Sequence, residues 1–147
     1  MQDNLKKLVV CFVFNKDLKK VLLIHKNRPE RQKGKVNGIG GKLKIGETKK
    51  AAIVREFFEE TGVTIPANEW MEFGKMLIES EKIMYLFAAV YKDNISSVKT
   101  TTDEEIEWFS VNKLPSNIMT NLAWLIPLAG DKLRNDEVAY VTVHNNF

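Results

Sequence analysis

One segment constrains the fold more than any other part of the chain. It runs from Gly41 to Val63 and reads GKLKIGETKKAAIVREFFEETGV. This segment predicts a helix that begins near Thr48, because a threonine hydroxyl accepts a hydrogen bond from a free backbone N–H of the first turn. The helix is expected to end at Thr61, since the following Gly62 adopts a left-handed conformation without strain. We expect the helix to pack on a core through Ala51, Val54, Phe57 and Phe58.

Three glutamates are expected on a separate face of the same helix. Glu56, Glu59 and Glu60 fall within an arc of about 100°, because each residue of a helix advances by about 100°. Glu56 and Glu60 repel each other at a spacing of four residues, and the helix dipole disfavours anions in the last turn by roughly 0.3–1 kcal/mol each. Mg²⁺ and Mn²⁺ prefer oxygen ligands, and binding one removes this repulsion. The glutamates therefore predict a divalent-cation site rather than a solvated acidic face.

Residues just before the helix fit the same interpretation. Gly40 and Gly41 have no side chain, so a backbone carbonyl or amide can lie close to a metal or a phosphate. The guanidinium of Arg55 can hold a carboxylate with two parallel hydrogen bonds. We therefore predict a Glu47–Arg55 ion pair that positions the preceding loop against the helix.

The rest of the chain predicts a single layered domain over residues 1–147, of mixed α/β or α+β class. A second helix is expected at about Asn121–Leu133, whereas Lys26–Lys35 and the glycine-rich run Asn37–Gly41 are expected to form a loop. The expected strands are Leu8–Phe14, Val21–Ile24, Glu69–Glu79, Ile83–Tyr91, Ile106–Phe109 and Val138–His144.

Composition excludes several classes of protein. The longest apolar run, Leu8–Phe14, has seven residues, whereas a membrane span needs about 20. The first residues lack a basic region that leads into a small-residue cleavage site, so no secretory signal is expected. The one cysteine, Cys11, and two histidines far apart in the chain exclude a Cys/His zinc cluster and indicate a reducing cytoplasm.

Positive charge is concentrated in one segment of the chain. The net charge is only +3, but Lys26–Lys50 contains nine basic and two acidic residues. This surplus indicates an anionic ligand. The segment contains no aromatic residue, which disfavours a duplex nucleic-acid surface.

The pattern of the central segment also carries a resemblance to a known family. Gly41-x5-Glu47-x7-Arg55-Glu56-Phe57-x-Glu59-Glu60-x-Gly62-Val63 resembles the Nudix box of the Nudix hydrolases without a gap. Phe57 is the one departure, because the family more often has an aliphatic residue there. The resemblance implies an α/β/α sandwich around a mixed β-sheet, with the box at residues 41–63.

The activity implied by this resemblance is hydrolysis of a nucleoside diphosphate linked to another group, with Mg²⁺ or Mn²⁺ as cofactor. Glu56 and Glu60 would be the principal metal ligands, and Glu59 would be a further ligand or hold a metal-bound water. The backbone carbonyl of Gly40 would complete the site. Arg55, together with Glu47, would support this catalytic group.

The sequence does not decide which residue acts as the general base. In some members of the family it lies on the helix, and in others it is an acid on a later loop. Asp103, Glu104 and Glu105 are the loop candidates in this chain.

Within the family, the run from Asn37 to Lys42 most resembles MutT-type enzymes and oxidised-purine nucleoside triphosphatases. The Asn37 amide, with a donor and an acceptor, would read a purine edge, or it would only shape a turn. Lys26 and Arg28 are expected to hold the terminal phosphates. Lys42 and Asn121 are further expected substrate contacts, whereas Trp124 is expected in the core.

Several alternatives remain within this resemblance. Residues 77–80 (Leu-Ile-Glu-Ser) lack the proline that ADP-ribose hydrolases usually carry there, and Tyr85 is not at the usual position of the tyrosine in dinucleoside polyphosphate hydrolases. RNA 5′-end hydrolysis stays open because of the basic segment. A non-catalytic nucleotide sensor is the competing class, although this chain keeps every glutamate of the box. The chain is expected to be a monomer or a homodimer, with no membrane partner.

Overall fold

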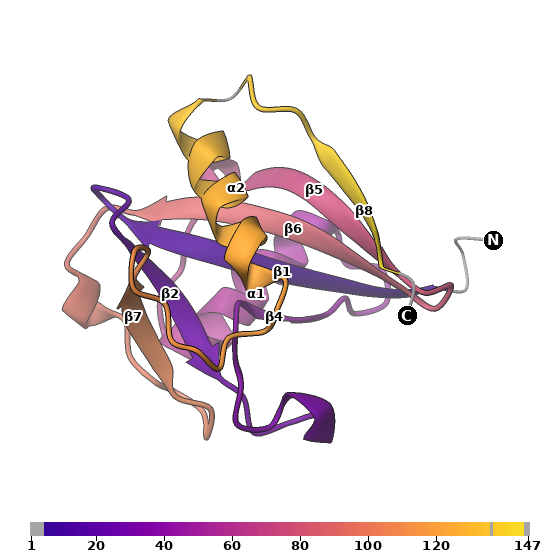
Figure 1. Cartoon of the computed structure of the whole chain (residues 1–147), viewed down its shortest axis with the longest axis horizontal. Helices are drawn as coiled ribbons and strands as arrows, with labels where there is room; N and C mark the ends of the chain where they lie inside the picture. Colours follow the sequence, from indigo (N-terminus) through magenta and orange to yellow (C-terminus); the bar gives the residue numbers. More distant parts are fainter. Residues whose placement is uncertain (1–4, 136, 146–147) are drawn as a thin grey trace.

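The computed structural model describes residues 5–135 and 137–145, which form one mixed β-sheet between two helices. Helix α1 lies behind the sheet and helix α2 in front of it (Figure 1). This layered arrangement confirms the expected fold class. In chain order the elements are β1 Lys6–Asn15, β2 Lys20–His25, β3 Val36–Asn37, β4 Ile39–Lys42, α1 Lys49–Thr61, β5 Met71–Ile78, β6 Lys82–Tyr91, β7 Ile106–Ser110, α2 Leu122–Arg134 and β8 Val141–Asn145.

Strand β1 is the centre of the sheet, which runs β3-β2-β1-β6-β5-β8. It pairs in parallel with β6 along its whole length. On its other side it pairs with β4 over residues 8–11 and then with β2 over residues 13 and 14, antiparallel in both cases. Because β1 is covered on both faces, its sequence is a continuous apolar run and does not alternate between apolar and polar residues.

Each helix covers a separate hydrophobic core. Successive residues of β1 point to opposite faces, so Val9, Cys11 and Val13 pack on the α1 side. Val10, Phe12 and Phe14 pack on the α2 side. Trp70 joins the α1 core, where its ring meets that of Phe57 edge-on with 5.5 Å between centroids.

Helix α1 has the predicted ends. The Thr48 hydroxyl accepts a hydrogen bond from the Ala51 N–H at 3.1 Å, and Gly62 is left-handed with φ 74°. The expected apolar face, however, is partly wrong, because Ala51 is exposed and Phe58 is 51% exposed. The buried residues are Ala52, Ile53, Phe57 and Thr61. The helix is therefore rotated so that Glu56 and Glu60 border its buried side.

The glycine-rich run expected as a loop instead forms strands β3 and β4, which is a correction to the sequence prediction. The physical reason is the close approach of β4 to β1. A Cβ added at Gly40 would lie 1.9 Å from the Val9 carbonyl oxygen, and one at Gly38 would lie 2.8 Å from the Cys11 carbonyl oxygen. Only residues without a Cβ fit at these positions.

Smaller corrections concern element ends and one aromatic residue. The strand expected from Glu69 starts at Met71, after a 3₁₀ turn, and the last strand starts at Val141 rather than Val138. Trp124, expected in the core, is 44% exposed on α2. In the part of the chain that the structure describes, neither helix has the length and apolar character needed to cross a membrane.

Gly40 and Gly130 provide a matched test of the close strand contact. We expect Gly40→Ala to lower the free energy of unfolding by roughly 1–3 kcal/mol, because the new methyl group overlaps backbone that cannot move alone. A Cβ added at Gly130 in α2 would meet the flexible end of the Arg134 side chain at 3.1 Å and the Phe14 ring at an ordinary contact distance of 3.8 Å, and alanine favours a helix by roughly 0.5–1 kcal/mol. Urea unfolding of both variants is the measurement. A Gly40→Ala protein as stable as the wild type would contradict the structural role of this glycine.

Candidate active site

The three box glutamates lie on the last two turns of α1, with very different exposure. The side chain of Glu56 is 13% exposed and that of Glu59 is 48% exposed. The carboxylate of Glu56 lies close against Gly41 of β4. A Cβ added at Gly41 would be only 2.3 Å from the Glu56 Oε1 atom. Glycine at position 41 therefore makes room for the Glu56 carboxylate between helix and strand.

Arg55 joins the helix to the loop and the strand before it. Its Nε and Nη2 atoms donate to the two carboxylate oxygens of Glu47 at 2.7 and 2.9 Å, which confirms the predicted ion pair. Nη2 also donates to the Lys42 carbonyl oxygen at 3.0 Å. Nη1 donates to Glu56 Oε1 at 2.9 Å and lies 3.4 Å from both carboxylate oxygens of Glu59.

The pKa values of three acids at or near Arg55 differ according to their surroundings. Hydrogen bonds from Arg55 lower the pKa of Glu47 to about 2. The pKa of Glu56 is raised because burial outweighs the hydrogen bond from Arg55. The pKa of Glu60 is raised as well, by burial and by repulsion from Glu104 and Glu59. Glu56 and Glu60 are thus partly buried carboxylates whose negative charge is incompletely compensated.

The chemistry of this donor set fits a hard divalent cation. All the donors are carboxylate oxygens, and a cation would remove the repulsion among them. Within residues 5–135 and 137–145, no three acidic, histidine or cysteine side chains already converge on one point. Arg55 occupies one oxygen of Glu56, which leaves the remaining oxygens for a cation. Ligation by the Gly40 carbonyl stays a prediction.

The loop before β7 contacts Glu60 of α1 through Thr102. The Thr102 hydroxyl donates to Glu60 Oε2 at 2.9 Å. Glu104 is buried and accepts from Lys26 Nζ at 3.0 Å and from the backbone N–H groups of Asn27 and Arg28 at 2.6 and 3.3 Å. Burial raises the pKa of Glu104, but these hydrogen bonds outweigh it, so the pKa is lowered overall.

These contacts show how the expected phosphate ligands and loop bases are placed. Arg28 donates to Asp103, and this lowers the pKa of that carboxyl. Lys26 is paired with Glu104. Both acids are therefore weak proton acceptors that anchor the loop after β2, and both cations are partly neutralised. Glu105 is exposed, and its carbonyl accepts from the backbone N–H of His25.

The expected substrate contacts are more dispersed. The Asn37 amide donates to Gln32 Oε1 at 3.1 Å and accepts from the Gly38 N–H at 2.8 Å, so it shapes the turn before β4. Asn121 precedes α2 and lies 3.8 Å from the sulfur of Met76. It therefore belongs to the α2 side of the sheet, because Met76 is part of the α2 core. Contact of either residue with a substrate stays a prediction.

Sequence reasoning missed Thr102 and Asn27 as members of this site. Thr102 lies 42 positions after Glu60 in the chain, and Asn27 is 77 positions before Glu104. Neither belongs to a recognisable local pattern, so only the folded arrangement reveals them.

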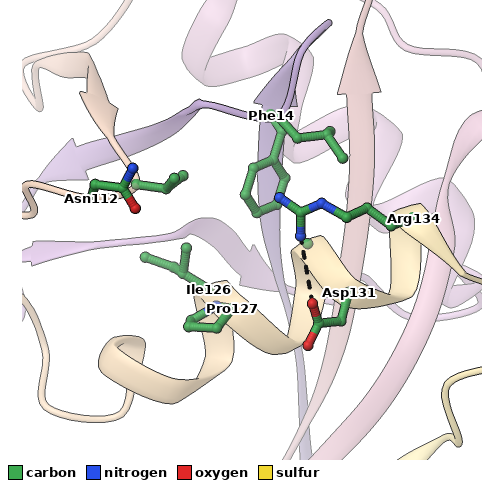
Figure 2. A pocket seen from close by; sticks show the side chains of 9 residues that line it. Phe14, Asn112, Ile126, Pro127, Asp131 and Arg134 are labelled. Carbon is green, nitrogen blue, oxygen red and sulfur yellow. Dashed lines mark hydrogen bonds and ion pairs between the residues drawn. The ribbon is translucent and has the colours of Figure 1, made fainter.

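A hollow of about 200 Å³ lies on the far side of the sheet, beside α2 (Figure 2). Phe14, Ile126 and Pro127 give it an apolar wall. Its charged groups are Asp131 and Arg134, which form an ion pair at 3.5 Å. The expected catalytic residues do not line this hollow, so the glutamates of α1 stay the predicted site of chemistry.

Comparison with known proteins identifies the family of this chain. The NUDIX domain family model matches residues 5–128. The chain therefore belongs to the NUDIX family.

The relatives found are similar to this chain over different extents. An oxidized purine nucleoside triphosphate hydrolase of Danio rerio is 34% identical over 110 residues, which is 69% of this chain and 66% of that protein. A NUDIX hydrolase of Nitrosomonas europaea superposes with a TM-score of 0.79 at 19% identity, over 98% of this chain and 80% of that one. A MutT/nudix family protein of Enterococcus faecalis has a TM-score of 0.63 at 21% identity, over 72% of this chain but only 44% of that one. The last two show a shared fold.

A double-mutant cycle tests the link between Glu47 and Arg55. We expect the losses in free energy of unfolding from Glu47→Ala and Arg55→Ala to be non-additive by roughly 0.5–3 kcal/mol at pH 7. The folded-state pKa of about 2 lies below the unfolded value of about 4.3. The coupling is therefore full above pH ~4.3 and is lost as the pH falls towards 2.

The exposed Lys92–Glu69 pair, with 3.9 Å between its charged atoms, is the matched control. The coupling energy between Lys92 and Glu69 should be near zero both at pH 7 and as the pH falls towards 2. Additive effects at Glu47 and Arg55 would show that the ion pair does not stabilise the fold.

Proposed function

We propose that this protein is a metal-dependent hydrolase that cleaves a nucleoside triphosphate into a nucleoside monophosphate and pyrophosphate. The observation that carries the proposal is the pair of partly buried, incompletely neutralised carboxylates of Glu56 and Glu60. Their arrangement destabilises the folded protein unless a cation binds, which indicates selection for binding rather than stability. Membership of the NUDIX family supports the same conclusion.

The favoured substrate is an oxidised purine nucleoside triphosphate. The similarity to the Danio rerio protein of that name supports this choice, as does the position of Asn37 before the glycines of β4. ADP-ribose, dinucleoside polyphosphates and an RNA 5′ end are the alternative substrates, and a nucleotide sensor is the alternative class.

Each residue of the site would have a distinct role. Glu56 and Glu60 would hold the cation, for which Mg²⁺ is the favoured identity and Mn²⁺ the substitute. The bound metal would neutralise the diphosphate, polarise phosphorus and lower the pKa of a water. Arg55 keeps Glu56 in place through the hydrogen bond from Nη1 and fixes the loop that carries Glu47.

The reaction forms a bond between a water oxygen and phosphorus and breaks the bond to the leaving pyrophosphate. The water proton must pass to a carboxylate during this step. We place that acceptor on α1 rather than on the loop, because Asp103 and Glu104 are already tied to Arg28 and Lys26. Glu59, about half exposed and held only by long contacts to Arg55, is the favoured group.

Glu60→Gln keeps the shape of the side chain and the acceptor for Thr102 but removes the charge. We expect turnover of nucleoside triphosphates in Mg²⁺ to fall by at least about 100-fold, because the cation loses a ligand. Without metal, the variant should be as stable as the wild type or slightly more stable, since repulsion at the helix C-terminus is reduced.

Pyrophosphate release and thermal unfolding in a metal chelator are the two measurements. Glu69→Gln, which removes an exposed carboxylate outside the box, should leave both unchanged. Full Mg²⁺-dependent activity in Glu60→Gln would refute the assignment.

Asn37→Ala tests base selection. We expect kcat/KM for the preferred purine triphosphate to fall roughly 5- to 150-fold, the equivalent of one buried polar contact. A pyrimidine triphosphate should lose much less, because the phosphates are held elsewhere. Equal losses on both substrates would mean that Asn37 only shapes the turn through Gln32 and Gly38.

A further inference from the structure

A second hollow, of about 440 Å³, has a strongly basic lining. Four of its six residues are cations. The lining residues are Lys6, Leu8, Arg28, Pro29, Lys42 and Lys82. We call this the basic hollow.

Its lysines come from three neighbouring strands and share one face of the sheet. Lys6 of β1 is directly paired with Lys82 of β6, and Lys42 of β4 is paired with Leu8 of β1. Alternation along β1 and β6 puts these positions on the same side as Val10 and Leu86, which belong to the α2 core. The basic hollow thus opens on the α2 side of the sheet.

The positive charge of the basic hollow is poorly compensated. It has no acidic residue in its lining, and within the described residues no ion pair involves Lys6, Lys42 or Lys82. Like charges directly opposite each other in a sheet are destabilising. Burial and the nearby cations Arg31, Lys6 and Lys42 lower the pKa of Lys82, and they outweigh the opposing effect of Glu81.

The basic hollow adjoins the glutamate site at two points. Arg28 lines the hollow, donates to Asp103 and feels the negative charge of Glu60. The carbonyl of Lys42 accepts from Arg55, while its side chain lines the hollow. Among the described strands β4 pairs only with β1, so no strand covers its other edge.

We propose that the basic hollow binds a phosphate of the substrate other than those of its 5′-triphosphate. This proposal rests on the proposed function. The substrate would then be a nucleoside 5′-triphosphate with a further phosphate at the 3′ position of its sugar. That group is a 3′-phosphate monoester or the first phosphodiester of a short oligonucleotide. Several ammonium groups around one hollow match the oxygens of a phosphate, with charge-assisted hydrogen bonds to each.

The test compares guanosine 5′-triphosphate with two analogues, its 3′-phosphate and a 5′-triphosphorylated dinucleotide. Wild-type kcat/KM should be higher for at least one analogue. The double variant Lys6→Ala, Lys82→Ala should lose roughly 10- to 100-fold on that analogue. On guanosine 5′-triphosphate it should change less than about threefold.

Lys16→Ala is the matched control, because Lys16 directly follows β1 at the end opposite Lys6. It should affect no substrate. Which analogue responds distinguishes a monoester from a phosphodiester, and either response supports the proposal. Equal effects of the double variant on all three nucleotides would overturn it.

Equilibrium binding of the same nucleotides to the Glu60→Gln protein separates this proposal from the proposed function. If the wild type hydrolyses none of them but the analogue binds more tightly and loses this advantage without Lys6 and Lys82, the proposed function fails and the phosphate site stands. If hydrolysis is normal but neither kinetics nor binding responds to the extra phosphate, the phosphate site fails alone.

Discussion

The guanidinium of Arg55 is the interaction on which the site depends. Its planar group donates at once to Glu47 in the loop, to the Lys42 carbonyl at the end of β4 and to Glu56 on its own helix. A lysine has one charged atom and cannot span these acceptors in fixed directions. The loop, the strand and the helix therefore share one rigid junction, and the glutamates are positioned relative to the glycines by it.

Charge is distributed unequally around this junction. On the α1 side, Glu56 and Glu60 carry negative charge that burial and mutual repulsion disfavour. On the α2 side, Lys6 and Lys82 repel each other across a strand pair. Both features destabilise the isolated protein, and ligands of opposite charge would relieve both. In the proposed function, a cation and a phosphorylated substrate would together provide that compensation.

Local patterns in the sequence predicted much of the fold and part of the site. Thr48 and Gly62 delimited α1 correctly, because capping depends on residues within one turn. The Glu47–Arg55 pair was also predictable from type and spacing. The glycine run was assigned to a loop because glycine is common in turns, and the close approach that requires it at position 40 involves Val9, far away in the chain. The rotation of α1 was misjudged for a similar reason, since Ile53 and Phe57 are buried by the sheet.

By itself, the sequence determined the identity and spacing of the carboxylates, the ends of the helix and the family, because these depend on neighbouring residues. Only the tertiary structure decided how that chemistry is surrounded. It paired Lys26 and Arg28 with Glu104 and Asp103, brought Thr102 to Glu60 and gathered Lys6, Lys42 and Lys82 around one hollow. The physical reason is that hydrogen bonds and charge interactions act over a few ångströms, whereas these partners are tens of residues apart in the chain.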